Sequence, residues 1–201
     1  MLNAFRLTFQ SFAFCFLPFA FCFLPFAFCL SGCQDSEYAQ MVKREQARGV
    51  RVDSIFLGLK FGDSKKDFFD KCRKLNQEGV TEDGSGAGLK VQVLRKIDST
   101  LTDAKVYMYF YPEFNEKYQI IEMPVHYAYE SYFPYAERYH SKILLPQVLK
   151  LLEHDYGKFI PVFKPGKDTI YVHIDGNRRI TVNKKDDQFV YAKFTDLTAV
   201  K

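Results

Sequence analysis

Histidine and serine are the side chains of this 201-residue chain that could do metal or covalent chemistry, and their spacing offers little of either. No two of the four histidines have the His-x-x-x-His spacing that places two metal ligands on one face of a helix. Glu137 and His140 form one half of a di-iron carboxylate pattern, but the chain has no second half. The Gly-x-Ser-x-Gly nucleophile motif is also absent. We therefore expect no cofactor, no metal site and no catalytic residue.

One enzymatic alternative stays open, an envelope hydrolase in which His126 or His140 works with a nearby carboxylate. His154 lies between two acidic residues near a predicted helix end, where a cationic side chain is mildly favoured without any catalytic role. The glycine-rich stretch 82–88 lacks the Lys-Ser/Thr pair of a phosphate-binding loop. We interpret it as a connection between strands.

Tyrosine is the residue type whose clustering points to a binding function. Nine of the 13 tyrosines lie between residues 107 and 139. Tyr107, Tyr109 and Tyr111 alternate with apolar residues, so in a strand they share the face opposite the apolar one. Tyrosine offers contact area at low entropic cost together with a polar tip, which suits recognition of a protein or a glycan. The alternative is that these rings fill the second face of a sheet between two halves of the molecule.

The elements that would position these side chains follow a leader of different composition. Ten of the 21 phenylalanines fall within residues 1–28, and no Asp or Glu occurs before Asp35. Arg6 gives a positive start, and residues 12–30 are all Phe, Ala, Cys, Leu or Pro. This pattern is typical of a secretory signal peptide. A retained membrane helix is the alternative, since 19 apolar residues reach the lower end of spanning length.

The segment Leu30-Ser31-Gly32-Cys33 closes this leader. It resembles the lipobox of bacterial lipoproteins, in which an aliphatic and two small residues precede the cysteine that receives lipid. The resemblance implies a signal peptide over 1–32, cleavage between Gly32 and Cys33, and acyl chains such as palmitate on Cys33. It also implies export and attachment to membrane lipid, with the mature chain facing the periplasm or the cell surface. Gln34 stands where an Asp that retains lipoproteins in the inner membrane would stand, which favours the outer membrane.

The mature chain has an ordinary soluble composition, which excludes intrinsic disorder for most of it. A formal net charge of +4 for the whole sequence is too small to indicate a nucleic-acid partner. Once the leader is removed and Cys33 carries lipid, Cys72 stands alone, so no internal disulfide is expected. Cys72 lies on an apolar helical stripe and is expected to be a buried small hydrophobic residue.

Residues 33–49 are polar and charged, and we predict that they form a lipidated tether ahead of a folded domain at 50–201. A short strand is expected over residues 50–57. The first helix is predicted over residues 64–77, with Ser64 as its cap and Asp67 as the capping-box partner.

A second helix carries an apolar stripe from Ile143 to Leu152 and ends at Tyr156-Gly157, with Pro146 either at its first position or inside a longer helix. Alternating segments predict three strands after each helix, at 89–97, 105–111, 118–129, 169–174, 179–183 and 189–195.

This order predicts an α+β fold with antiparallel sheet and two helices, arranged as tandem helix–three-strand units with halves at 50–130 and 131–201. The segment Phe61-Gly62-x-Ser64-Lys-Lys-x-x-Phe69 and the element order are similar to the tandem domains of the β-lactamase-inhibitor-protein-like and outer-membrane assembly lipoprotein (SmpA-like) group. The second half, with Tyr156-Gly157-Lys158, is similar to uncharacterised small lipoproteins of Gram-negative bacteria. The sequence therefore predicts a lipid-anchored, non-enzymatic binding module of the cell envelope whose partner is a protein or a glycan.

Overall fold

The structure is a computed structural model that describes residues 36–83, 92–94, 104–163, 166 and 168–199, and residues 37–201 form one compact unit. The described α-helices are α1 (Glu37–Ala47), α2 (Lys65–Gln77) and α3 (Ser141–Tyr156). The described strands are β1 (Thr81–Asp83), β2 (Gln92–Leu94), β3 (Val106–Phe110), β4 (Glu113–Phe114), β5 (Ile120–Tyr129), β6 (Ile160–Val162), β7 (Ile170–Asp175), β8 (Arg178–Lys184) and β9 (Val190–Asp196).

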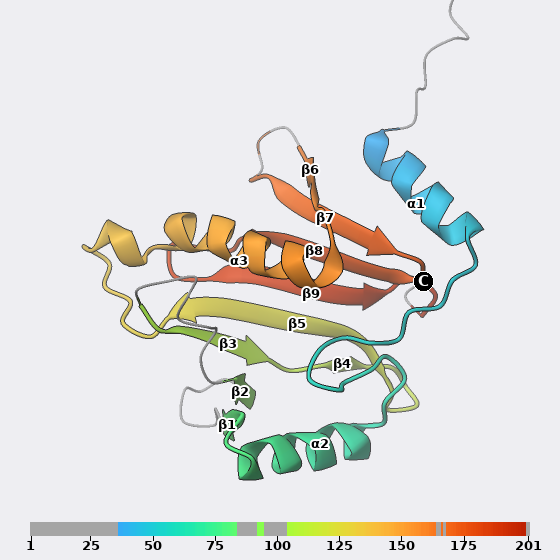
Figure 1. The fold of residues 1–201 in the computed structure, drawn as a ribbon, viewed down its shortest axis with the longest axis horizontal. Coiled ribbons are helices and arrows are strands. Elements are labelled where there is room, and N and C mark those ends of the chain that lie inside the picture. Colours follow the sequence, from blue (N-terminus) through green and yellow to red (C-terminus); the bar gives the residue numbers. More distant parts are fainter. Residues whose placement is uncertain (1–35, 84–91, 95–103, 164–165, 167, 200–201) are drawn as a thin grey trace, which may run out of the picture. The chain divides into compact units, whose positions relative to one another are not determined.

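All nine strands belong to one antiparallel sheet with the order β1-β2-β3-β5-β9-β8-β7-β6, and β4 pairs with β5 off this path (Figure 1). The predicted α+β class with an antiparallel sheet is confirmed. The last strands of the two halves, β5 and β9, pair at the centre, and the earlier strands of each half lie progressively outward. The two predicted units thus share one continuous sheet instead of forming separate ones.

Each unit contains more strands than the three that were predicted. The short strands β1, β4 and β6 have two or three residues each, too few to give a period in the sequence. Of the strand predicted over 89–97, the structure describes only β2, and the glycine-rich stretch beyond Asp83 lies outside the described residues.

Helix α2 begins where the sequence predicts it. The Ser64 hydroxyl accepts a hydrogen bond from the Asp67 amide at 3.1 Å, and the Asp67 carboxylate accepts one from the Ser64 amide at 3.1 Å. This reciprocal capping box satisfies two backbone N–H groups at the start of the helix. Helix α3 continues through Pro146 and ends at Gly157, so the proline lies inside a longer helix.

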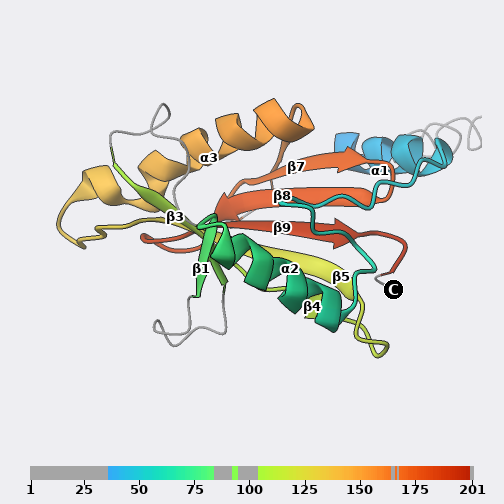
Figure 2. The ribbon, with the colours of Figure 1, turned by 60° about the horizontal axis from the view of Figure 1, so that its bottom comes forward.

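Alternation along the strands divides the sheet into two faces. On the core face, Val106, Met108 and Phe110 of β3 are buried in one cluster that also contains Phe68 of α2 and Leu144 of α3. Both helices therefore cover the same face of the sheet (Figure 2). We call the opposite side, which α2 and α3 do not cover, the outer face.

Helix α1 covers one end of the outer face. Its Met41 packs on Val172 and Ile174 of β7, in a cluster separate from the main core. The Arg48 guanidinium also lies 3.5 Å from the Asp175 carboxylate. Residues 37–47, which were expected to belong to the tether at 33–49, thus form part of the folded unit.

Residues 53–61 form a tight loop where a strand over 50–57 was expected. Ser54 pairs with Lys60 across a single β-bridge, and Leu57 has a φ of 50°. Positive φ is rare for a leucine and is incompatible with a continuous strand. The loop buries Ile55 and Leu59 in the main core, so its apolar residues fill the space above the sheet instead of extending it.

Candidate functional site

A row of four side chains crosses the middle of the outer face. The strand register places Tyr109 of β3 opposite His126 of β5, His126 opposite Tyr191 of β9, and Tyr191 opposite Asn183 of β8. Each is half-buried, while the strand neighbours of Tyr109, His126 and Tyr191 are buried in the core. The row is therefore a direct result of strand alternation combined with the pairing of β5 with β9.

Phe189, just before β9, joins three of these rings into one cluster. Its ring centroid lies 6.3 Å from that of Tyr109 and 5.7 Å from that of His126, in edge-to-face arrangements at 82° and 80°. His126 and Tyr191 are 5.1 Å apart, and Tyr107 adds a further ring 6.3 Å from Tyr109. We call Tyr107, Tyr109, His126, Phe189 and Tyr191 the aromatic patch. Edge-to-face contacts hold such rings in fixed relative orientations.

Lys185, in the turn between β8 and β9, approaches this patch from the side. Its Nζ lies 3.1 Å from Nε2 of His126 and 5.7 Å from the centroid of Phe189. The turn itself is held by Asp186, whose carboxylate accepts hydrogen bonds from the amides of Gln188 and Phe189 at 2.9 and 2.7 Å. Burial and then the nearby Lys185 ammonium lower the pKa of His126, so its neutral imidazole can accept a hydrogen bond from Lys185.

Two carboxylates at the border of the patch are bound within the protein, Glu130 by Tyr107 and Lys105, and Glu122 by Lys193. The hydroxyl of Tyr107 donates to Glu130 at 2.6 Å, and this hydrogen bond raises the pKa of Tyr107 to about 12. On the same face, Lys193 lies 3.0 Å from the buried carboxylate of Glu122. These pairs leave the aromatic rings as the accessible centre of the face.

The structure brings two of the three predicted tyrosines together. Tyr107 and Tyr109 lie on the outer face as predicted. Tyr111 is different, because β3 ends at Phe110 and Tyr111 lies in the irregular stretch between β3 and β4. The ring of Tyr111 packs 5.9 Å from Phe68 of α2, on the core side, so the prediction that it shares a face with the other two is corrected.

Sequence reasoning missed the contribution of β9 and of the turn before it. In the sequence, Val190, Ala192 and Phe194 occupy every second position around Tyr191, and this alternation would have placed Tyr191 on the outer face. In the structure the three apolar residues are buried and Tyr191 is half-buried. The contact between Lys185 and His126 had no sequence signal, because it depends on which strands are neighbours.

His140, the other histidine of the hydrolase alternative, lies away from the aromatic patch at the N-terminus of α3. Its Nε2 lies 3.0 Å from the backbone oxygen of Pro134, and its ring packs 5.7 Å from Tyr132. His126 faces a lysine and aromatic rings instead of a hydrogen-bonded carboxylate. Neither arrangement places a nucleophile against a base.

Other predicted features lie elsewhere or outside the described residues. Cys72 is buried as predicted, and burial raises the pKa of its thiol to about 11. Gly32 and Cys33, the predicted cleavage and lipidation site, lie outside the described residues.

Within the described ranges, no three His, Cys, Asp or Glu side chains are grouped as metal ligands, and no helix is both long and apolar enough to cross a bilayer.

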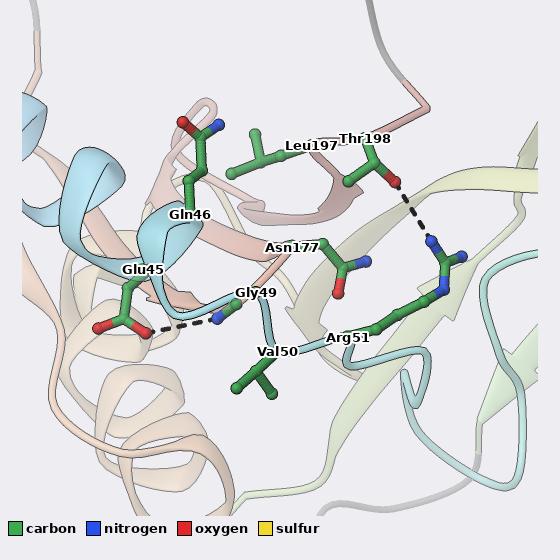
Figure 3. Close-up of a pocket in the computed structure, with 9 residues that line it drawn as sticks. Glu45, Gln46, Gly49, Val50, Arg51, Asn177, Leu197 and Thr198 are labelled. Carbon is green, nitrogen blue, oxygen red and sulfur yellow. Dashed lines mark hydrogen bonds between the residues drawn. The ribbon is translucent and has the colours of Figure 1, made fainter.

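A separate cavity of about 350 Å³ lies between the end of α1, the β7–β8 turn and the end of β9 (Figure 3). Its carboxylate, Glu45, accepts hydrogen bonds from Arg48 and from the Gly176 amide. Burial alone would raise the pKa of Glu45, but these hydrogen bonds hold it below its usual value. Arg51, on the other side, lies 3.4 Å from both Asp196 and Thr198. Because its charged groups already have partners within the protein, this cavity offers a ligand little to bind.

Comparison with known proteins assigns no family. No family model matches the chain, and no curated protein matches it. Among solved structures, the chain is similar to the DUF4309 family protein YjgB from Bacillus subtilis, with 12% identity over 78% of this chain and 93% of that one and a TM-score of 0.34. A likeness at this level assigns neither a fold nor a function.

Proposed function

We propose that the chain is a non-enzymatic binding module of the cell envelope, attached to membrane lipid through Cys33, that binds a protein or glycan partner through the aromatic patch. The observation that carries this proposal is the packing of five aromatic rings, from three strands and one turn, on a sheet face that the two core helices leave uncovered. Aromatic rings held in place lose little entropy on binding and are common at the centres of protein interfaces.

The layout of charge supports a binding role for this face. At the border Lys105 pairs with Glu130 and Lys193 with Glu122, while the centre is aromatic, which is the arrangement of an apolar interface core surrounded by a polar rim. The leader supports the location, because a signal peptide that ends in a lipobox delivers the following domain to a membrane surface outside the cytoplasm. No observation on the described histidines favours the hydrolase alternative.

The test is quantitative capture of envelope components by the full tagged chain, extracted in detergent from the cells that produce it. The double variant Tyr109→Ala/Tyr191→Ala is compared with native protein and with Tyr135→Ala, which removes a completely exposed tyrosine away from the patch. We expect one component to be captured by native protein and by Tyr135→Ala but lost with the double variant. Equal capture by all three proteins, each with an unchanged melting curve, would overturn the proposal.

A further inference from the structure

Lys185 differs from the other described lysines around the aromatic patch. Lys193 pairs with Glu122 and Lys105 with Glu130 on the same face, and the adjacent Lys184, on the core side of β8, pairs with Asp187 at 2.8 Å. Lys185 has no carboxylate within ion-pair distance among the described residues. Its nearest polar neighbour is the imidazole of His126.

The Lys185 ammonium, on an exposed turn, lies 3.1 Å from the half-buried imidazole of His126 in β5, and this pair of nitrogen groups has no bound carboxylate among the described residues. An ammonium group has three protons to donate, and the contact with His126 uses one of them. A carboxylate placed between the two groups would accept a hydrogen bond from each once His126 is protonated. The groups that face His126 are Lys185 and Asp186 from the turn, Tyr109 from β3 and Tyr191 from β9. Asp186 does not supply the missing acceptor in this structure, because its Oδ1 is bound to the amides of the turn and its carboxylate lies beyond ion-pair distance of the Lys185 ammonium.

We propose that the partner presents an acidic peptide segment, one of whose carboxylates binds between the Lys185 ammonium and the His126 imidazole while adjacent side chains lie on the aromatic patch. This inference rests on the proposed function and specifies the partner for the same face. The carboxylate completes for Lys185 the charge pairing that Lys105 and Lys193 of the same face already have. Hydrogen bonds between charged groups at the edge of an aromatic surface are stronger than those between neutral groups.

The ring geometry favours a peptide over a glycan. Sugars stack on flat, exposed ring faces, whereas here Phe189 meets Tyr109 and His126 at 82° and 80°. Rings set edge to face provide an uneven surface in place of a coplanar platform. Such a surface fits the side chains of a peptide, in the way that tyrosines of binding loops contact proteins.

The first experiment uses the full chain in detergent micelles and a capped hexaglutamate peptide, with capped hexaglutamine as the uncharged control. We expect hexaglutamate alone to shift the imidazole NMR signals of His126 in a saturable way and to bind more tightly as the pH falls toward 5. Lys185→Gln is expected to weaken this binding about tenfold, the loss typical of one charge-assisted hydrogen bond. Lys150→Gln, which removes an exposed lysine from α3, is expected to change it less than about twofold.

Three results would overturn the acidic-peptide contact: no shift of His126 with hexaglutamate, the same shift with hexaglutamine, or equal binding by Lys185→Gln. A shift with a sulfated oligosaccharide but not with hexaglutamate would also overturn it and would indicate an acidic glycan.

The capture experiment separates this inference from the proposed function. If Lys185→Gln captures the partner normally while Tyr109→Ala/Tyr191→Ala does not, the carboxylate contact is wrong and the binding face stands. If both variants capture normally, both proposals fail. Loss of capture with both variants, and not with Lys150→Gln, supports both.

Discussion

Gly176 shows how closely the β7–β8 turn approaches the segment that follows α1. Its φ is 57°, and Asp175 pairs with Arg178 on either side of the two-residue loop. A positive φ at the first loop residue is the pattern of a type II′ hairpin, where glycine is preferred. A Cβ atom at Gly176 would lie 2.2 Å from the backbone oxygen of Val50, so the side chain is excluded by contact as well as by conformation.

The variant Gly176→Ala is therefore expected to destabilise the protein by about 3 kcal/mol, from the left-handed backbone penalty together with displacement of Val50. Gly58→Ala is the matched control, because Gly58 has a φ of 74° but open space around it. It should cost only about 1 kcal/mol. Urea denaturation measures both variants, and equal losses would show that the contact with Val50 contributes nothing.

His126 makes the stability of the domain depend on pH in a defined direction. Burial and Lys185 lower its pKa in the folded state below the unfolded value of about 6.5. The unfolded chain therefore binds the proton first, and stability falls as the pH decreases from about 7 through the folded pKa. We expect His126→Gln to show a smaller loss of urea midpoint between pH 7.5 and pH 5 than native protein.

At the residue scale, the position of a side chain could be predicted from the sequence only where neighbours in its own strand determine it. Tyr109 could be placed from alternation with Met108 and Phe110 alone. The contact of Lys185 with His126 could not, because 59 residues separate them and only the pairing of β5 with β9 joins them.

At the scale of elements, the loop of residues 53–61 joins the two halves of the molecule. Phe56 packs 5.0 Å from Phe110 of β3 and 5.5 Å from Phe194 of β9. The Ile55 carbonyl accepts a hydrogen bond from the hydroxyl of Tyr156 in α3 at 2.6 Å. The loop thus connects β3, β9 and α3 on the core face of one sheet.

Phe56→Ala is expected to destabilise the protein by about 3 kcal/mol, because it removes ring contacts with both halves and leaves a cavity. Phe163→Ala, at a position 74% exposed, should change stability by less than about 0.5 kcal/mol. Thermal melting monitored by circular dichroism measures both. A Phe56→Ala midpoint equal to that of native protein would contradict the bridging role of the loop.

The same loop shows why sequence analysis predicts some elements and not others. Helix α2 was predicted at its correct start because the Ser64–Asp67 capping box is entirely local. The loop was mistaken for a strand because its apolar residues are buried by α2, α3 and the sheet, none of which leaves a local signal. Strands β1 and β6 were missed for their length alone.

At the scale of the whole molecule, the lipid anchor carries the proposed location. We expect Cys33→Ala to abolish incorporation of labelled palmitate and to leave an uncleaved precursor, because the cysteine is both the acceptor and part of the cleavage site. Cys29→Ala, four residues earlier in the leader, should be labelled and cleaved normally. Gel mobility and palmitate labelling in growing cells measure both variants, and normal processing of Cys33→Ala would remove the basis for an anchored protein.

The two ends of the sheet have a consequence for a protein concentrated on a membrane. An outermost strand can pair with the outermost strand of a neighbour and so build a growing polymer. Both outermost strands, β1 and β6, have only three residues. Strand β6 contains Pro161, which has no N–H to offer, and β1 ends in Glu82 and Asp83, whose charges repel a second copy. If the chain is anchored as proposed, these edges would let many copies crowd on one bilayer without polymerising, and the proposed binding face would stay available.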